Sequence, residues 1–221
     1  MAMKKLLLTS VAALFLATGT VLTTVPASAA DIHAVLNCYP GFNCITLQGE
    51  IKSIHDYGAF ARAADSLPRN YPTSVYLNSP GGNVRIGMAI IAEITMRGYD
   101  TVVPANATCA SMCANIWLAG KRRFVTEHSR VGFHSTSIRG VRSEHGNEEV
   151  KEFYRILNLI RRRSGADITE EMTADDIIAM DTDITEETMN TLVAADPDGM
   201  LWMTAKLARK LGIEYGFIPI K

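Results

Sequence analysis

Ser111 lies in the stretch ATCASMCANIWLAG, residues 107–120, where small residues lead into an apolar run at helical spacing. A serine at the start of a helix has its hydroxyl close to unpaired backbone N–H groups and to the positive end of the helix dipole. An acyl-transfer nucleophile needs such surroundings, because negative charge develops on the carbonyl oxygen that it attacks. The alternative reading is a serine that only caps the helix.

Two other features supply the remaining groups that acyl transfer requires. The loop NSPGG ends in Gly81 and Gly82, and glycine lets bare backbone approach a substrate closely. We expect the amides of Gly82 and Met112 to be the two donors to the oxyanion. His134 ends the run SRVGFH and is the candidate general base. Taken singly, these signals equally fit a plain turn and a surface histidine.

The elements that must position these residues follow from hydrophobic periodicity and turn residues. Strands are predicted over residues 43–51, 73–79, 100–105, 122–126 and 129–134. Helices are predicted over residues 53–67, 83–98, the segment that begins at Ser111, and 144–163. Gly98 is the expected C-cap of the second helix. Further helices are expected to start near Thr173, Thr185 and Thr204, each threonine serving as an N-cap.

Strands that alternate with helices predict an α/β fold of repeated βαβ units with a mostly parallel sheet flanked by helices. The Gly81–Gly82 loop and the Ser111 loop both lie at strand-to-helix junctions, where sites form in such sheets. We expect one domain over residues 30–221, since its length and 48% hydrophobic content suit a single core.

The order of these motifs resembles the proteolytic subunit of Clp protease and the wider ClpP/crotonase superfamily. VYLNSPGGNVRIGMAII is similar to that family's strand, Gly-Gly turn and helix, and ITLQGEI is similar to its first strand. CASMCANIWLAGKRRFVTEHSRVGFH is similar to its nucleophile helix, its Gly-Lys-Arg turn and the strand that ends in the catalytic histidine. The resemblance covers about residues 43 to 134 and keeps the separation of 111 − 82 = 29 residues.

The resemblance implies a serine peptidase that uses no cofactor or metal. Ser111 would be the nucleophile and His134 the general base. The amides of Gly82 and Met112 would form the oxyanion hole. An extended peptide or an unfolded protein would lie beside the Gly81–Gly82 strand as substrate. The resemblance further implies assembly into a homo-oligomeric ring, for which we expect the helix over 144–163 to supply the contact.

The third member of the triad is where the chain departs from the family's pattern. Counting back from LGI in DPDGMLWMTAKLARKLGI places Met200 where the family has an aspartate. Asp198 is our first candidate for the acid. The other candidates are Asp196, Asp183 and Asp181, and a Ser–His dyad or an inactive site also stays open. Methionine cannot orient an imidazole or stabilise its protonated form.

Four cysteines remain beyond the N-terminal segment, in two close pairs. In an oxidising compartment such spacing favours disulfides. We expect Cys38 and Cys44 to form a staple near the N-terminus. Cys109 and Cys113 would bridge across Ser111 and hold its turn, which requires Cys109 to lie outside the helix. Buried free thiols at these two positions, or a zinc site, are the alternatives.

Residues 1–29 have the pattern of a secretory signal peptide. Lys4 and Lys5 precede an apolar run, and PASAA supplies the small residues of a cleavage site after Ala29. The alternative is an uncleaved membrane anchor. Cleavage predicts a periplasmic or secreted protein with no membrane segment. It would leave 22 − 2 = 20 basic and 23 acidic residues, a formal charge of −3 that disfavours nucleic acid as a partner.

Two other functions, and one other catalytic base, compete with an ATP-independent serine peptidase that uses Ser111 and His134. The methionine at the expected acid position suggests an inactive scaffold that captures peptides. Crotonase-like chemistry on acyl thioesters would need coenzyme A outside the cytoplasm. A Ser–Lys pair would use Lys121, but the neighbouring Arg122 and Arg123 indicate that this stretch is solvated charge, whereas a lysine base must be desolvated.

Overall fold

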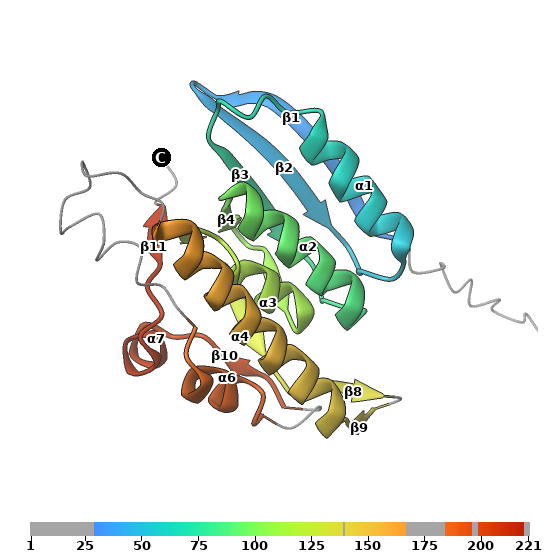
Figure 1. The fold of residues 1–221 in the computed structure, drawn as a ribbon, viewed down its shortest axis with the longest axis vertical. Coiled ribbons are helices and arrows are strands. Elements are labelled where there is room, and N and C mark those ends of the chain that lie inside the picture. The colour runs from blue at the N-terminus through green and yellow to red at the C-terminus, as the bar shows by residue number, and fades with distance from the viewer. Residues whose placement is uncertain (1–28, 139, 167–183, 196–198, 219–221) are drawn as a thin grey trace, which may run out of the picture.

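The structure of the chain, a computed structural model, describes residues 29–218 except 139, 167–183 and 196–198. Most of the predicted signal peptide, the helix expected near Thr173 and the acid candidates therefore lie outside the described residues. Figure 1 shows the mixed α/β architecture, in which helices flank a mostly parallel sheet, as predicted.

The main sheet has six strands in the order β1-β2-β3-β4-β6-β11. Its five parallel members are β2 (Phe42–Gln48), β3 (Thr73–Asn78), β4 (Asp100–Val103), β6 (Arg123–Thr126) and β11 (Gly216–Ile218). A second sheet of order β10-β7-β5 combines β5 (Thr108–Ala110), β7 (Arg130–Phe133) and β10 (Leu201–Trp202). A small hairpin is formed by β8 (Ser137–Ile138) and β9 (Val141–Arg142).

Several helices begin or end at the capping residues that the sequence predicts. The described helices are α1 (Ile54–Asp65), α2 (Val84–Arg97), α3 (Met112–Leu118), α4 (Glu144–Ala166), α6 (Glu186–Leu192) and α7 (Ala205–Leu211). Gly98 ends α2 in the left-handed conformation, with φ 65°. The hydroxyls of Thr185 and Thr204 each accept a hydrogen bond from the first turn of their helix, α6 and α7, so both predicted N-caps are confirmed.

An N-terminal strand is present that the sequence analysis did not predict. β1 (Asp31–Tyr39) pairs antiparallel with β2, and the Cys38–Cys44 disulfide links the two strands next to their turn. Pro40 and Gly41 form the turn, and Gly41 has the positive φ of 81° that a glycine adopts without strain. The signal for this hairpin was the two-residue Pro-Gly turn between apolar runs.

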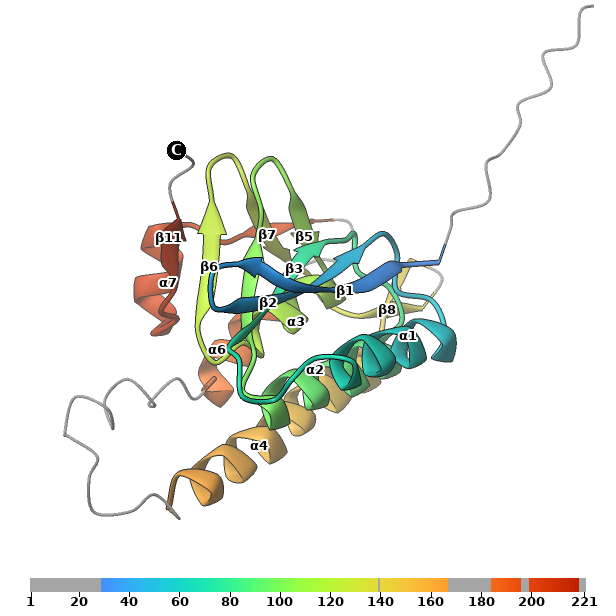
Figure 2. The same cartoon turned by 90° about the horizontal axis from the view of Figure 1, so that it is seen from above.

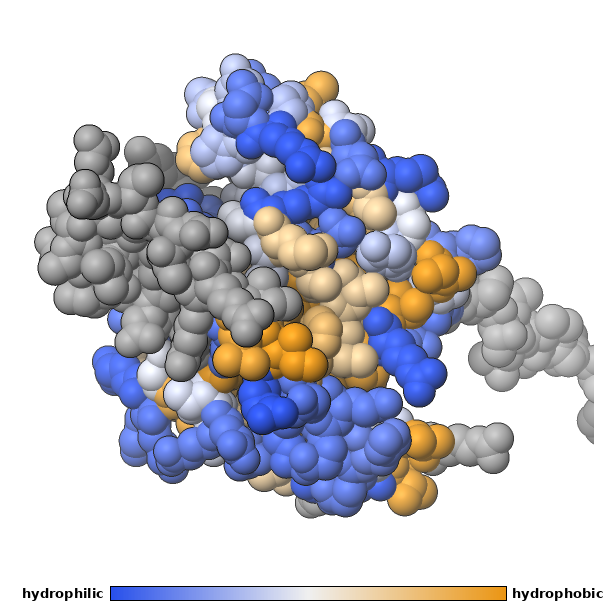
Figure 3. Space-filling view, viewed as in Figure 1, coloured by the Kyte–Doolittle hydropathy of each residue, from blue (hydrophilic) through white to orange (hydrophobic). Residues whose placement is uncertain are grey.

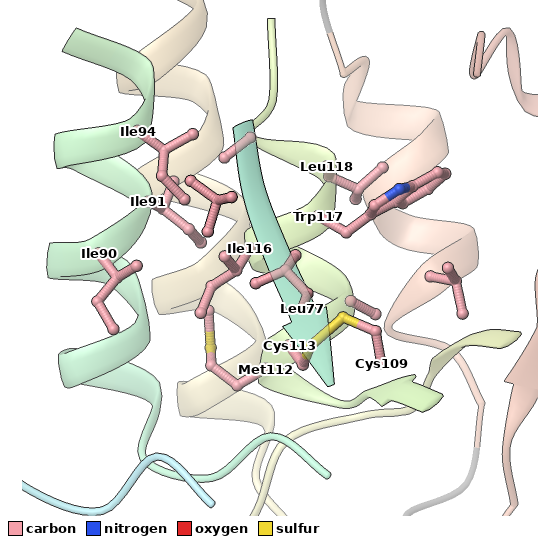
Figure 4. Close-up of a cluster of buried hydrophobic side chains, with 14 of the residues drawn as sticks. Leu77, Ile90, Ile91, Ile94, Cys109, Met112, Cys113, Ile116, Trp117 and Leu118 are labelled. Carbon is pink, nitrogen blue, oxygen red and sulfur yellow. A yellow bond between two sulfur atoms is a disulfide. The ribbon is translucent and has the colours of Figure 1, made fainter. Parts of the chain in front are cut away.

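The core lies between α2, α3 and the sheet. α3 is buried along nearly all of its length, and it contacts β3, β4, β5, β7 and α2. Figure 4 shows Ile90, Ile91 and Ile94 of α2 facing Met112 and Ile116 of α3. Figure 2 shows α1, α2 and α4 together on one side of the main sheet. The helix that carries Ser111 is therefore held by packing on several sides.

One sequence interpretation is corrected by the buried charge at Arg123. We expected Arg123 to be solvated, but its guanidinium is buried and donates to the carbonyls of Leu118, Gly120 and Glu214. Three carbonyl acceptors compensate much of the desolvation of this cation. Arg123 thus ties the C-terminal end of α3 to the segment before β11.

Among the described residues, none of the helices has both the length and the apolar character that a bilayer crossing requires.

Candidate active site

The two loops singled out in the sequence meet in space. Ser79 N–H donates to the Thr108 carbonyl, and Ala110 N–H donates to the Ser79 carbonyl, at 2.9 and 3.0 Å. Gly81 lies directly on the Ser111 turn: a Cβ at Gly81 would stand 2.7 Å from both Ser111 Cβ and the Met112 nitrogen. Only glycine permits this approach, so the Gly81–Gly82 loop is fixed against the turn that carries Ser111.

Ser111 occupies the turn between β5 and α3 in a conformation that is rare for a residue with a side chain, with φ 56° and ψ −125°. Such strain costs on the order of 1–3 kcal/mol and is concentrated at functional sites. The Ser111 hydroxyl makes no capping hydrogen bond, although the residue stands at the N-cap position of α3. The reading of Ser111 as a plain helix cap therefore does not account for this side chain.

The backbone around Ser111 compensates part of this cost. Ser111 N–H donates to the Gly132 carbonyl at 2.9 Å. The Ser111 carbonyl accepts from the amides of Ala114 and Asn115, and from the Asn115 side chain. Ser111 is partly exposed at the surface while the rest of the turn is buried. The hydroxyl is thus presented on a turn that the surrounding structure holds in place.

His134 reaches the same place through the β5–β7 pairing. Ala110 pairs with Gly132 in that parallel ladder, so the register continues with Ser111 beside Phe133, and His134 is the next residue of the chain. The imidazole is partly exposed, and its Nδ1 lies 2.6 Å from the Ser135 carbonyl oxygen. Among the described residues no hydrogen bond joins the Ser111 hydroxyl to the imidazole. Catalytic hydrogen bonds in structures without substrate are often long and tighten when substrate binds.

The two predicted oxyanion donors lie on either side of Ser111. Met112 begins α3, so its N–H precedes the first hydrogen bonds within the helix. Gly82 forms an isolated parallel bridge with Ile51, in which Gly81 accepts from Ile51 and Asn83 donates to it. The Gly82 amide is not used by this bridge, and Gly82 is exposed. Gly82 is therefore open to an oxygen outside the fold, whereas Met112 is 3% exposed, and the pairing of the two amides as an oxyanion hole stays a prediction.

A disulfide spans the nucleophile turn, as the spacing predicted. It joins Cys109, the middle residue of β5, to Cys113 in the first turn of α3, and both residues are fully buried. Cys109 lies outside the helix, which is the condition that the sequence analysis set. The second predicted disulfide, Cys38–Cys44, is also present. All four sulfurs are paired, so the alternatives of buried free thiols and of a zinc site do not describe this structure.

Met200 lies beside His134, on the strand that pairs with the other side of β7. Leu201 pairs with Phe133, so continuing this register by one residue sets Met200 opposite His134. The Met200 thioether covers Gly132: a Cβ on Gly132 would lie 2.6 Å from Met200 Cγ. The sequence prediction that Met200 occupies the expected acid position agrees with this placement. Asp198, Asp196, Asp183 and Asp181 lie outside the described residues, so an acid among them stays a prediction.

Lys121 is not brought to Ser111. It is exposed and follows the C-terminal end of α3, whereas Ser111 stands at the N-terminal end of the same helix. The nearby Arg122 pairs with Asp100, which raises the pKa of the Arg122 guanidinium. The structure thus gives no support to a Ser–Lys pair.

Two residues near the imidazole were missed by the sequence analysis. Ser135 is fully buried and supplies the carbonyl that bonds the His134 Nδ1. Asn147 is buried in the first turn of α4 and bonds the peptide group that follows Ser135. The sequence signal that could have indicated Ser135 was its position directly after the histidine. Asn147 gave no signal, because it is distant in the sequence and asparagine is common near helix starts.

The comparisons with known proteins identify the family of this chain. A family profile described as Clp protease matches residues 45–218, which includes both loops and His134. The chain is similar to the "ATP-dependent Clp protease proteolytic subunit" of Porphyromonas gingivalis, with 28% identity over 70% of this chain and 61% of the relative. It is 31% identical to "ATP-dependent Clp protease proteolytic subunit 2" of Rhodococcus jostii, over 66% of this chain and 65% of the relative.

A third relative is "ATP-dependent Clp protease proteolytic subunit 1" of Chlamydia pneumoniae, 31% identical over 66% of this chain and 70% of the relative. The chain thus spans 61% to 70% of the length of these three curated relatives. The β1 strand and the Cys38–Cys44 pair lie at or before the first matched residue of the family profile. The profile nevertheless covers well over half of the chain, from β2 through β11, and this chain belongs to the Clp protease family.

Proposed function

We propose that this protein is a serine peptidase in which Ser111 attacks the peptide carbonyl and His134 transfers the proton. The amides of Gly82 and Met112 would stabilise the oxyanion, and one such donor typically contributes about 10²–10³ in rate. The observation that carries the proposal is the turn at Ser111. Its strained, non-capping serine lies between the Gly81–Gly82 loop and the strand that leads to His134.

The substrate we propose is a short or unfolded peptide in extended conformation. A pre-formed parallel bridge between Ile51 and Gly82 leaves the Gly82 amide exposed beside Ser111. An extended peptide that pairs with backbone at this position would bring its carbonyl to the hydroxyl. The expected export signal would separate the chain from cytoplasmic ATP, so we propose cleavage without an ATP-driven unfoldase.

We also propose that the protein is periplasmic or secreted and is cleaved after Ala29. The two disulfides support this location, since disulfides persist in oxidising compartments. Intact-mass measurement of the exported protein tests it. A mass that begins at Ala30 with both disulfides formed is expected, and a full-length chain with free thiols would contradict the proposal.

The second candidate function is an inactive scaffold that binds peptides without cleaving them. Met200 at the expected acid position favours it, because a thioether supplies none of the orientation that an aspartate gives the imidazole. In that case the surface beside the Gly81–Gly82 loop would hold peptides, but Ser111 would not react.

Hydrolysis of unfolded protein and of short fluorogenic peptides by the mature chain, with no ATP added, separates the two functions. We expect Ser111→Ala and His134→Ala each to lower kcat by at least about 10³. Ser137→Ala and His128→Ala are matched controls, because both residues are exposed, and they should leave kcat unchanged. Equal hydrolysis by Ser111→Ala, or binding of peptide without hydrolysis by folded wild-type protein, would contradict the peptidase.

A further inference from the structure

The orientation of the His134 imidazole has an unusual source, a backbone carbonyl. Nδ1 lies 2.6 Å from the Ser135 carbonyl oxygen. A carbonyl only accepts hydrogen bonds, so Nδ1 must carry the proton in this arrangement. Nε2 is then left with the free lone pair that a general base needs to accept a proton from a hydroxyl. The Ser135 carbonyl therefore selects the catalytically useful tautomer.

The peptide group that contains this carbonyl is held from its opposite side by Asn147. In a trans peptide the C=O and the N–H point in opposite directions, so the N–H of Thr136 points away from the imidazole. That N–H donates to Asn147 Oδ1 at 2.7 Å. The single proton of the Thr136 hydroxyl is shared between the same oxygen and the Ser143 carbonyl, each at 2.9 Å. An acceptor on the N–H fixes the plane of the peptide and polarises its carbonyl, which strengthens the bond to Nδ1.

Asn147 is well placed to serve as a fixed anchor. Only 1% of its surface is exposed, and its backbone N–H donates to the Ser143 carbonyl in the first turn of α4. Its Nδ2 donates to Glu144, whose carboxyl pKa is held below its ordinary value by hydrogen bonds from Arg142 and Asn147. The side-chain amide thus has partners on both ends, and its oxygen cannot turn away from Thr136 without losing them.

The rest of the loop is equally constrained. Ser135 is fully buried, and its N–H donates to the Ala195 carbonyl at 3.0 Å. α4 approaches the loop so closely that a Cβ on Gly146 would lie 2.5 Å from the Thr136 hydroxyl oxygen. On the other side of His134, the pairing of β10 with β7 places Met200 opposite the histidine, so this position carries a thioether and not a carboxylate.

We propose that Asn147 is a positioning residue for the general base, acting through the Ser135–Thr136 peptide group and taking over the orienting role that the family resemblance assigns to an acid. The inference rests on the proposed peptidase for its catalytic meaning, but the tautomer of His134 is measurable without any activity. It also departs from our sequence-based choice of Asp198, because the single Nδ1 proton is already donated to the Ser135 carbonyl.

The test is ¹⁵N NMR of the His134 imidazole in the full mature chain, with Asn147→Ala, Asn147→Asp, Thr136→Val and Asp198→Asn. Wild type should show a protonated Nδ1 and an unprotonated Nε2. Asn147→Ala should lose this tautomer preference, and Asn147→Asp should keep it because a carboxylate oxygen still accepts from the Thr136 amide. Thr136→Val is the matched control, since it removes the hydroxyl but leaves the N–H.

Kinetics on the same variants supply the second readout. Asn147→Ala should lower kcat by about tenfold to a hundredfold, as removing a group that orients a functional histidine commonly does. KM should change by less than about threefold, and Asn147→Asp should restore kcat. A residue with a purely structural role would instead lower stability and leave both tautomer and kcat of the folded protein unchanged.

Loss of the tautomer in Asp198→Asn, with its retention in Asn147→Ala, would overturn the inference in favour of the acid. If Asn147→Ala does not fold, the Asp198→Asn spectrum decides alone. An unchanged tautomer in that variant supports the Ser135 carbonyl as the group that orients His134, and a lost tautomer supports the acid. A wild-type enzyme that shows the expected tautomer but no hydrolysis would refute the proposed peptidase and leave this inference standing.

Discussion

Ser111 joins a free hydroxyl to a backbone conformation that a side chain makes costly. Its φ of 56° would suit glycine, yet serine is present, and its side chain makes no capping hydrogen bond. The stability of the fold would be served better by a residue without a Cβ. The side chain of Ser111 therefore has no structural role that would explain the strain. A reactive hydroxyl held on a rigid turn does explain it.

Ser111→Gly is therefore expected to stabilise the protein. Relief of strain should raise the free energy of unfolding by about 1 kcal/mol, after allowance for the greater freedom of glycine in the unfolded chain. Ser111→Ala is the matched control, because it removes the hydroxyl and keeps the strain. Urea denaturation with a constant m-value measures the difference. A glycine variant less stable than the alanine variant would show that the turn is not strained.

At this scale the sequence predicted which residues gather but not how they are held. Ser111, Gly81, Gly82 and His134 were predictable because turn glycines and strand ends have local signatures. The Ser135 carbonyl was not, since the direction of a single peptide group depends on partners distant in the chain. Asn147, the partner in this case, is 11 residues away from Thr136.

Among the secondary-structure elements, β5 and α3 are joined by the Cys109–Cys113 disulfide, which closes a short loop around Ser111. The Cys38–Cys44 disulfide closes a loop of nearly the same length at the β1–β2 hairpin. Chain-entropy arguments assign each about 2 kcal/mol of stabilisation. The two disulfides therefore form a natural pair for comparison, one at the site and one remote from it.

The double variants Cys109→Ala/Cys113→Ala and Cys38→Ala/Cys44→Ala should lose similar stability, about 2 kcal/mol each. Only the first should also slow peptide hydrolysis, by about tenfold or more, because a small misplacement of a nucleophile is costly. Thermal unfolding and kcat of the folded variants are the measurements. Equal hydrolysis rates in the two variants would mean that the site disulfide stabilises the fold without positioning Ser111.

Most elements were predicted within a few residues because their ends carry capping signals, as at Gly98, Thr185 and Thr204. The hairpin partner β1 was missed. Burial alternates only over its first five residues, and the apolar Leu36 and Tyr39 are exposed, so the alternation is lost in the second half of the strand. β5 was also missed as a strand separate from α3, because a strand of three residues is too short to show an alternating pattern in the sequence.

On the scale of the whole molecule, α4 is the longest described helix and borders the site at its first turn. Apolar surface interrupts the hydrophilic face along the middle of α4 (Figure 3), where Ile156 is 46% and Leu159 is 55% exposed. The opposite side of the helix buries Val150, Tyr154 and Leu157 in the core. Two exposed apolar residues on one helix face support the predicted contact between copies of this chain.

Ile156→Asp combined with Leu159→Asp should convert the proposed homo-oligomer to smaller species, since it sets carboxylates in an apolar contact. Ile54→Asp is a matched control, because Ile54 is an apolar residue of another helix, 63% exposed at the start of α1. Native mass spectrometry of the mature protein gives the number of subunits. A monomeric wild type, or an unchanged subunit number in the double variant, would count against assembly through α4.

The proposed peptidase depends most on the reactivity of Ser111, and covalent labelling by a fluorophosphonate probe tests this reactivity directly. The folded mature protein should gain one phosphonyl group, mapped by peptide mass spectrometry to Ser111. His134→Ala should slow the labelling strongly, and Ser137→Ala should not. A folded wild-type protein that gains no label, or that is labelled at another residue, would contradict a peptidase built on this turn.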